Sequence, residues 1–309
     1  MLPIRERALP ITACVITYNE EHNVQACLES LAFCAELLVI DSHSEDATRD
    51  LATACGARVI ERDWPGHIEQ KNFAIEQATQ DWVLCIDADE RVTPELRTRI
   101  EELFADPSAL ARGYTLNRRN IYLGRWIRGG GFYPDRKLRL FRRGQGRWEG
   151  VNPHDHVYLD PPSRSGEVRD LDLDIEHYTY RGISDHLKTI DYFSTIAARE
   201  KLSRKKKSTA LNLLFGAPWK FFKMLILQGG LRDGWRGWIV AALGAYYVFL
   251  RYAKLWELIH VEGLTGDEPD IVRYGRRGEA ESAPALERDS EAEDPSVEAA
   301  VQAEAPTPS

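Results

Sequence analysis

Two aspartates separated by one residue, Asp87 and Asp89, follow the apolar run from Trp82 to Ile86. Five mostly apolar residues bounded by polar ones predict a buried strand. Such a strand delivers both carboxylates to the carboxyl edge of an open α/β sheet, where these sheets bind ligands. Carboxylates at i and i+2 can share one hard divalent cation with the phosphates of a substrate. The triplet therefore predicts a site for a nucleotide diphosphate, although an isolated copy is more often a solvated loop start.

The surrounding elements must hold this triplet in place, and strand patterns alternate there with helical patterns. This alternation predicts a parallel, doubly wound sheet. Another of these strands also ends on a carboxylate, Asp41. The predicted strands cover residues 11–17, 36–41, 57–61 and 82–86, and the predicted helices cover 24–31, 68–78 and stretches that begin near residues 44 and 93.

Four short motifs in this part of the chain together resemble family 2 glycosyltransferases with the GT-A fold. They are Thr17-Tyr18-Asn19-Glu20, Asp41-Ser42, Lys71-Asn72 and Asp87-Ala88-Asp89-Glu90. Further motifs resemble a narrower subgroup, the bacterial lipopolysaccharide core β-1,4-glucosyltransferases and their relatives. These motifs are Lys137–Arg143, Pro153–His156, His177–Arg181 and Tyr252–Glu257. The resemblance covers about residues 10 to 260.

The resemblance implies an α/β fold of the GT-A type, a Rossmann-like mixed sheet found in nucleotide-diphospho-sugar transferases. We expect this domain at residues 1–180, with a nucleotide-sugar half at about 10–105 and an acceptor half at about 106–180. A helical, membrane-associating region would follow at 181–260, and an acidic, largely disordered tail at 261–309.

The charge distribution supports the prediction of a tail. From Glu262 onward the chain has 13 acidic residues and 4 arginines, whereas the rest has 36 basic and 35 acidic residues. The net charge of −8 therefore belongs to the tail. The segment is also poor in aromatic residues, so it cannot bury enough apolar surface to order itself. We expect residues 275–309 to be a solvated, disordered segment, with partner binding as the alternative, and we expect no nucleic-acid partner.

The resemblance assigns nucleotide-binding roles at the predicted sheet edge. Asp41 would hydrogen-bond the edge of the base, and Lys71 would approach the nucleotide or its phosphates. A cation on the surface of a helix is the equally weighted alternative for Lys71, and Asn19 could instead cap the following helix. The residues expected to bind the nucleotide sugar are Thr17, Tyr18, Asn19, Glu20, Asp41, Lys71, Asp87 and Ala88.

The leaving diphosphate must also be neutralised, which a bound metal can do. By resemblance, Asp89 would ligate Mg²⁺ or Mn²⁺ directly, and Asp87 would lie near the ribose and the metal. His156 and His177 are possible metal or phosphate contacts, although a lone histidine is more often a hydrogen-bonded structural residue.

An inverting enzyme also needs a carboxylate that accepts the proton of the acceptor hydroxyl. The subgroup usually has a His-Glu pair, where this chain has His154-Asp155. Asp155 is therefore the first candidate for the base, Glu149 the second and Asp135 the third. Asp155 could equally stabilise a turn after Pro153.

Two arginines on a predicted strand, Arg139 and Arg142, alternate there with Leu140 and Phe141. We expect both guanidinium groups on one face, suited to a phosphate-bearing acceptor or a diphosphate. His154 could contribute to the same contacts. A solvated strand face is the competing interpretation.

The five cysteines lie in apolar strands and helices without a C-x-x-C pair, and no signal peptide precedes Ile11. Reduced thiols in a cytosolic protein are the plain interpretation. Neither a dinucleotide-binding nor a P-loop motif occurs. Residues 129–131, three glycines, predict a flexible loop.

Residues 199–260 combine cations with long apolar segments. Residues 199–207 carry six cations and one anion, and the run from Trp238 to Leu250 holds 13 residues without a charge. That run is short of the ~20 residues needed to span a bilayer. Aromatic residues beside cations are typical of helices that lie in the interface of an anionic membrane. We favour the membrane surface over an ordinary pair of core helices.

Together these features predict a metal-dependent, inverting glycosyltransferase. It would move a hexose, with glucose from UDP-glucose as the expected donor, to a lipopolysaccharide core or a related lipid-anchored glycan. We expect it in the cytoplasm, bound peripherally to the inner face of the bacterial inner membrane. The alternatives are transfer to a polyprenyl phosphate and a catalytically silent scaffold with the same fold.

Overall fold

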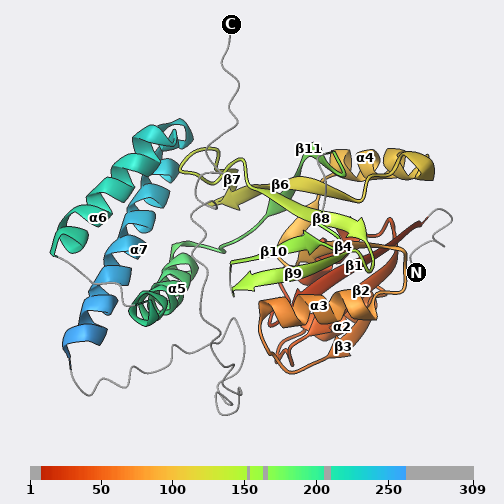
Figure 1. Ribbon diagram of the computed structural model, residues 1–309, viewed down its shortest axis with the longest axis horizontal. Helices are drawn as coiled ribbons and strands as arrows, with labels where there is room; N and C mark the ends of the chain where they lie inside the picture. Colours follow the sequence, from red (N-terminus) through yellow and green to blue (C-terminus); the bar gives the residue numbers. More distant parts are fainter. Residues whose placement is uncertain (1–7, 152–153, 163–165, 205–209, 262–309) are drawn as a thin grey trace, which may run out of the picture. The chain divides into compact units, whose positions relative to one another are not determined.

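The computed structural model describes residues 8–151, 154–162, 166–204 and 210–261 of the chain (Figure 1). These residues belong to one compact unit, Met1–Arg276. The acidic tail predicted at 275–309, and most of the predicted segment 261–309, lie outside the described residues.

The first half of the chain forms the predicted parallel sheet. Four strands pair in parallel in the order β3-β2-β1-β4, with helices in the connections between them (Figure 1). The elements are β1 (Leu9–Thr17), α1 (Val24–Ser30), β2 (Cys34–Asp41), α2 (Thr48–Ala54), β3 (Arg58–Glu61), α3 (His67–Gln77) and β4 (Trp82–Asp87). Because the strands are parallel, their carboxyl ends meet at one edge of the sheet.

The second half makes the sheet mixed. β8 (Arg136–Arg142) pairs antiparallel with β4 and with β6 (Gly113–Tyr122). The sheet continues through β11 (Val168–His177), which is parallel to β6, to the short β5 (Glu90–Val92). The remaining elements are α4 (Pro94–Phe104), η1 (Pro107–Ala109), β7 (Arg125–Trp126), which pairs with β6, and a separate two-stranded ribbon of β9 (Gly146–Val151) and β10 (His154–Leu159).

Alternating residues of the central strand β1 face two apolar cores. Ile11, Ala13 and Val15 pack into one core, whereas Cys14 packs into the other. Both faces of the strand are thus covered, as expected for a parallel sheet between helices. All five cysteines are free thiols.

Three helices follow the sheet. α5 (Ile183–Ser203) and α6 (Ala210–Phe222) both pack against α7 (Trp235–His260), and α6 and α7 run antiparallel (Figure 1). Two short turns, η2 (Lys223–Leu227) and η3 (Gly230–Asp233), connect α6 to α7. In the part of the chain that the structure describes, no helix combines the length and apolar character that a membrane crossing requires.

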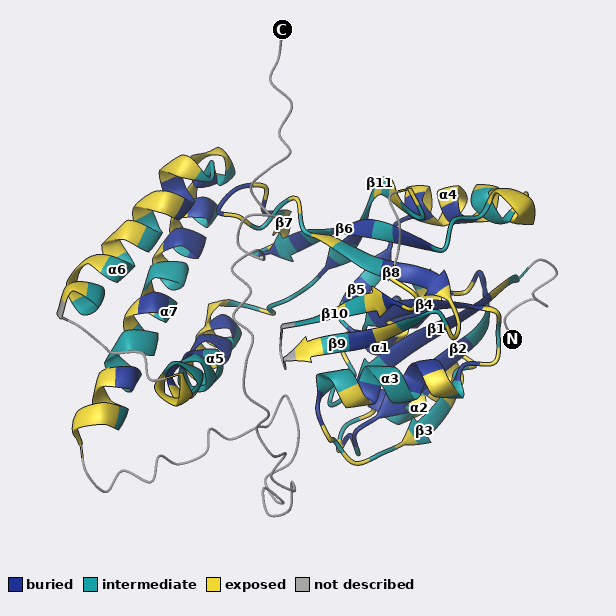
Figure 2. Ribbon diagram, viewed as in Figure 1, coloured by how far each residue is buried: buried dark blue, intermediate teal, exposed yellow. Residues whose placement is uncertain are grey.

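The α6–α7 hairpin nevertheless exposes large apolar side chains at helical spacing (Figure 2). The exposed fraction reaches 81% for Trp235. We call this surface the exposed apolar face. It consists of Leu211, Leu214, Phe215, Trp219, Phe222, Ile226, Leu227, Trp235, Trp238, Tyr246, Phe249, Trp256 and Ile259.

The glycine loop at residues 129–131 is held against the helical region, so the prediction of a flexible loop is wrong. The Asp233 carboxylate accepts hydrogen bonds from the backbone N–H groups of Arg128 and Gly129, at 3.0 and 2.8 Å. Gly130 N–H donates to the carbonyl of Gln228 at 2.9 Å. A Cβ on Gly129 would lie 2.4 Å from the carbonyl oxygen of Gly229, so only glycine permits this approach of two backbones.

We predict that Gly129→Ala destabilises the protein, because neither backbone can move aside as a flexible side chain would. Overpacking of this kind costs about 1–3 kcal/mol. Urea unfolding followed by circular dichroism measures the difference. Gly182→Ala is the control, since a Cβ at that position meets no atom within 4 Å. Equal stability of the two variants would show that the contact of residues 129 and 229 is not tight.

Candidate active site

A cavity of about 680 Å³ lies at the carboxyl ends of β1 and β4. Both aspartates of the D-x-D triplet line it, as does Ala88 between them. The other predicted site residues that line this cavity are Thr17, Tyr18, Glu20, Lys71, Arg139 and Asp155, together with His156 and His177. The active-site cavity is therefore built at the sheet edge that the sequence predicts.

Arg139 is buried beneath this cavity between two carboxylates. Its Nη2 atom donates to Asp87 Oδ2 at 3.0 Å and to Glu90 Oε1 at 2.8 Å, and its Nη1 atom donates to the Cys85 carbonyl at 3.4 Å. Only 2% of Arg139 is exposed, and Glu90 is fully buried. A buried charge is tolerated only when it is paired and hydrogen-bonded. Arg139 and its two carboxylates therefore depend on one another.

The predicted common face for Arg139 and Arg142 is wrong. Residues three apart on a strand point to opposite faces. The register of β8 against β6 also shifts at this point, so that Leu138 and Leu140 have partners on β6 and Arg139 lies between them as a bulge. Arg142 is exposed, lies over the Trp82 ring at 5.6 Å and does not line the cavity.

The cluster fixes the charge of the D-x-D aspartate. Burial disfavours the carboxylate of Asp87, but the charges of Lys71, Arg139 and Arg118 outweigh it and hold its pKa well below the usual range. The pKa of Glu90 shifts in the opposite direction. Burial and the repulsion from Asp87 together raise it, because the charges of Arg139 and Arg118 only partly offset these two effects. Asp87 therefore keeps its negative charge to a lower pH than Glu90 does.

Lys71 joins the D-x-D triplet to the ribbon. Its Nζ atom lies 2.8 Å from Asp155 Oδ2, 3.4 Å from Asp87 Oδ1 and 4.1 Å from the centre of the Trp148 ring. Only 11% of its side chain is exposed, so the alternative of a surface cation is wrong. Neighbouring Asn72 fixes the ribbon, since its side chain exchanges two hydrogen bonds with the backbone of Trp148.

The residues that could hold a metal are Asp89 and His177. Asp89 Oδ2 lies 3.3 Å from His177 Nε2. The other ring nitrogen of His177 lies 2.7 Å from Asn120 Oδ1, which orients the ring. Among the described residues, no group of three or more His, Cys, Asp or Glu side chains is placed to hold a metal. The pair therefore fits a divalent cation whose other ligands are water and substrate oxygens.

Asp41 does not reach the active-site cavity. It is fully buried, and its carboxylate accepts hydrogen bonds from the hydroxyl of Thr17 and from the backbone and hydroxyl of Ser44. These bonds tie the end of β2 to the end of β1 and shape the loop that carries Tyr18. Whether Asp41 binds a base edge stays a prediction.

Asn19 belongs to the same loop structure. Its backbone has a positive φ of 54°, and its side-chain oxygen accepts a hydrogen bond from Glu45 N–H at 2.8 Å. Helix α1 begins at Val24 with Asn23 as the N-cap, so the alternative that Asn19 caps that helix is wrong.

The three candidates for the base lie in different places. Asp155 faces the cavity from β10, with 10% of its side chain exposed. Glu149 pairs with His156 across the ribbon, contacts Arg147 and does not line the cavity. Asp135 does not line the cavity either, and although burial acts in the opposite direction, Arg118 and Lys137 lower its pKa. The side chain of His154 lies outside the described residues.

The sequence interpretation missed Glu90, Arg118 and Trp148. Arg118 donates to Asp135 Oδ2 at 2.7 Å and lies 3.7 Å from Glu90. Glu90 directly follows the D-x-D triplet, so an acidic residue after a buried strand was the available signal. No pattern in the sequence distinguishes Arg118 from the neighbouring Arg119, because only the register of β6 places one of them at the cavity.

Comparisons with protein families and with individual proteins both find glycosyltransferases. Residues 12–158 match the family "Glycosyl transferase family 2". The chain is 32% identical over 254 residues to the lipopolysaccharide core biosynthesis glycosyltransferase LpsC of Rhizobium meliloti, a match that covers 81% of this chain and 93% of LpsC. It is 29% identical to the uncharacterized glycosyltransferase RT0209 of Rickettsia typhi, over 80% of this chain and 87% of that protein.

A solved structure also matches in part. It is glucosyl-3-phosphoglycerate synthase from Mycobacterium tuberculosis in complex with Mn²⁺, UDP and glucosyl-3-phosphoglycerate. The identity is 23%, the TM-score is 0.29, and the match covers 37% of this chain and 44% of that chain.

Proposed function

The chain belongs to glycosyl transferase family 2, and from this premise we propose that it transfers a hexose from a uridine diphosphate sugar, with glucose as the expected sugar, to a lipopolysaccharide core acceptor. One observation carries the proposal. Two carboxylates of the D-x-D triplet, the ammonium group of Lys71 and the carboxylate of Asp155 converge in one cavity. Diphosphate binding and proton acceptance can then occur side by side.

The donor would enter from the end of β1. Tyr18 and Glu20 lie there to line the base and the ribose, and the hydrogen bonds of Asp41 keep their loop in place. The diphosphate would lie against Lys71, Asp87 and Asp89. Asp87 is already balanced by two cations, so Asp89 is the carboxylate that can bind a metal.

A divalent metal at Asp89 and His177 would neutralise charge on the leaving diphosphate. The protein residues have separate tasks. Asn120 orients the His177 ring, and Arg139 holds the side chain of Asp87 in place. Trp148 covers Lys71 with its ring, which shields that ammonium group from water.

Asp155 would accept the proton of the acceptor hydroxyl. Its bond with Lys71 uses Oδ2, which leaves Oδ1 for the acceptor. The acceptor would attack the anomeric carbon from the side opposite the diphosphate, so the anomeric configuration would invert. Glu149 remains the alternative base.

The acceptor class is inferred from the similarity to LpsC, whose name places that protein in lipopolysaccharide core biosynthesis. A lipid-anchored acceptor requires the enzyme to work at a membrane. The exposed apolar face of α6 and α7 supports peripheral binding there, because large exposed apolar patches on folded proteins mark interaction sites.

The proposed function is tested with a panel of nucleotide sugars. A bound donor raises the unfolding temperature by an amount set by its affinity and concentration. We expect UDP-glucose with Mn²⁺ to give the largest shift and transfer to a truncated lipopolysaccharide core to follow. Transfer to polyprenyl phosphate alone would change the acceptor class, and donor binding without transfer to any acceptor would favour a silent scaffold.

The first prediction from this proposal concerns the metal. Asp89→Ala should abolish the Mn²⁺ dependence of UDP binding and all transfer, because His177 alone cannot hold the cation. Calorimetric titration of UDP with and without Mn²⁺ measures the coupling. Asp63→Ala, a fully exposed carboxylate outside the cavity, serves as the control. If UDP binding by the Asp89 variant depended on Mn²⁺ as it does in the wild type, Asp89 would not be a metal ligand.

The second prediction concerns the base. Asp155→Asn should lower kcat by about 10²–10⁴-fold, the usual worth of general-base catalysis, while donor affinity stays near that of the wild type. Glu149→Gln should be mild. Steady-state kinetics with separate donor titrations distinguish the two effects. If Glu149→Gln lowered kcat more than Asp155→Asn did, Glu149 would be the base.

The third prediction concerns the membrane. The double variant Phe215→Ser, Trp219→Ser should co-sediment less with vesicles of anionic lipid, because it removes neighbouring residues of the exposed apolar face. Ile183→Ser, Leu187→Ser is the matched control, since it removes two exposed apolar residues of α5 at the same spacing. We expect the control to bind as the wild type does. Equal binding of both variants would mean that the hairpin is not the membrane-binding surface.

A further inference from the structure

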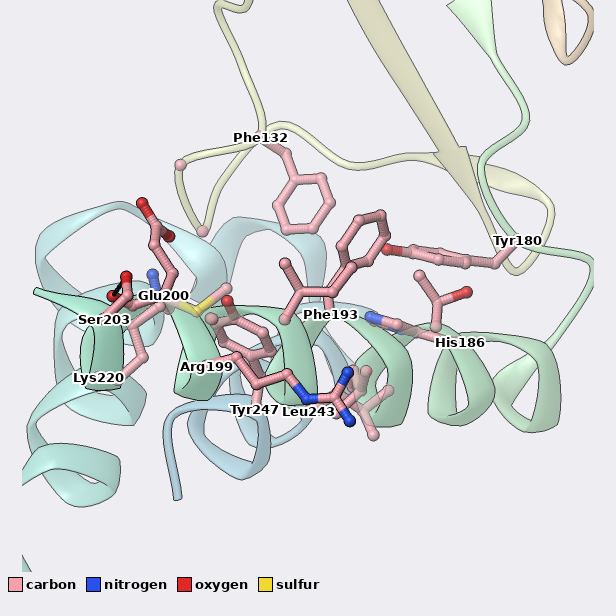
Figure 3. Close-up of a pocket in the computed structure, with 18 residues that line it drawn as sticks. Phe132, Tyr180, His186, Phe193, Arg199, Glu200, Ser203, Lys220, Leu243 and Tyr247 are labelled. Carbon is pink, nitrogen blue, oxygen red and sulfur yellow. Dashed lines mark hydrogen bonds between the residues drawn. The ribbon is translucent and has the colours of Figure 1, made fainter. Parts of the chain in front are cut away.

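A second cavity, of about 830 Å³, lies between α5, the α6–α7 hairpin and the glycine loop (Figure 3). A volume of this size is typical of a site for a small molecule or a lipid chain. Its wall on the loop side is made by Gly130, Gly131 and Phe132, which the bonds to Gln228 and Asp233 hold against the helices.

The inner part of this cavity is apolar. Ile190 and Met224, which are buried, line it together with the half-buried Phe193 and Leu243. His186 also lies there and stacks on Tyr180, with ring centres 3.9 Å apart. Burial lowers the pKa of His186 to about 4, so its ring is neutral near pH 7. The inner part therefore offers no charge to a ligand and favours an aliphatic one.

The other end of this cavity is polar and open to solvent. Ser203 is exposed there, with Glu200 and Lys220 beside it, whereas the guanidinium group of Arg199 points away from these three side chains (Figure 3). Glu200 pairs with Arg204 at 2.9 Å. In the described part of the chain no carboxylate lies within ion-pairing distance of Lys220, so the ammonium group of Lys220 is available to an anionic ligand at the mouth of the cavity.

The surroundings of Lys220 strengthen this conclusion. Burial, together with the nearby charges of Lys223 and Arg251, holds the pKa of Lys220 below its usual value. An anion at the mouth would offset that repulsion. The exposed apolar face lies on the other side of α6, because Phe222 stands about 200° around the helix from the cavity residue Lys220.

From this arrangement we propose that the second cavity binds one alkyl chain of a membrane lipid, with the anionic headgroup of that lipid at Lys220. The chain would run inward past Met224 and Phe193 toward Ile190. Phe193 lines both this cavity and the active-site cavity, so a bound chain would pack against a wall of the active site. The site is separate from the donor and acceptor sites of the proposed function.

The binding is tested on the full chain with two probes that share one chain, dodecyl phosphate and the uncharged dodecyl maltoside, each below its micelle-forming concentration. Calorimetry measures affinity and stoichiometry. We expect one saturable site for dodecyl phosphate. Ala197→Trp fills the cavity and should weaken binding of both probes at least tenfold, while Leu202→Trp, on the exposed side of the same helix, should not. Equal affinities of these two variants would overturn the proposal.

The headgroup site has its own matched pair of variants. Lys220→Gln should weaken dodecyl phosphate about tenfold, the value of one charge-assisted bond, and leave dodecyl maltoside unchanged. Lys188→Gln, an exposed lysine of α5 outside the cavity, should affect neither probe. This pair of variants tests the headgroup site even if Ala197→Trp does not fold. Equal effects of Lys220→Gln on both probes would overturn the assignment of an anionic headgroup.

Binding is measured without a nucleotide sugar, so its result is independent of the proposed function. The variant Asp89→Ala, which should be inactive, is expected to bind dodecyl phosphate as the wild type does. A protein that binds the probe but transfers no sugar would contradict the proposed function alone. A protein that transfers sugar but binds no probe would contradict the lipid site alone.

Discussion

The buried ion pair between Arg139 and the carboxylates of Asp87 and Glu90 is the constraint on which the active site depends. Arg139 comes from β8, whereas its partners come from the end of β4 and from β5, so one guanidinium group joins the two halves of the sheet. Removing one partner of a buried pair leaves an uncompensated charge, which typically costs about 3–5 kcal/mol. The free-energy cost of burying these charges is therefore offset only while the two halves of the sheet stay together.

How far the sequence predicts this arrangement depends on the range of the interactions. The four parallel strands and the position of Asp87 and Asp89 follow from local patterns of apolar residues, and the structure confirms them. The role of Arg139 does not follow, because a bulge in β8 aims its side chain and the bulge depends on pairing with β6. The packing of Gly129 was missed for a similar reason, since its partner is 100 residues away at Gly229.

The helical region shows a second limit of sequence patterns. A run of apolar residues on α7 predicts either a core helix or a membrane surface, and the structure has a buried face and an exposed apolar face on this one helix. Val240 and Val248 are buried against the neighbouring helices, while Trp238 and Phe249 are exposed. Composition alone cannot separate these faces, because it records how many residues are apolar and not which neighbour covers each of them. The second cavity provides a third environment for residues of these helices. The pattern of a single helix cannot predict it, because residues from several elements line it.

Lys71 connects donor binding to the chemistry in this framework. One ammonium group lies against the carboxylate proposed as the base and against a carboxylate of the D-x-D triplet. A diphosphate would be a stronger partner for it than either, because phosphate oxygens carry more charge. As Lys71 turned toward the donor, Asp155 would lose a partner and become free to accept a proton. The base would then be available mainly when the donor is in place, which would protect the enzyme from an unproductive acceptor complex.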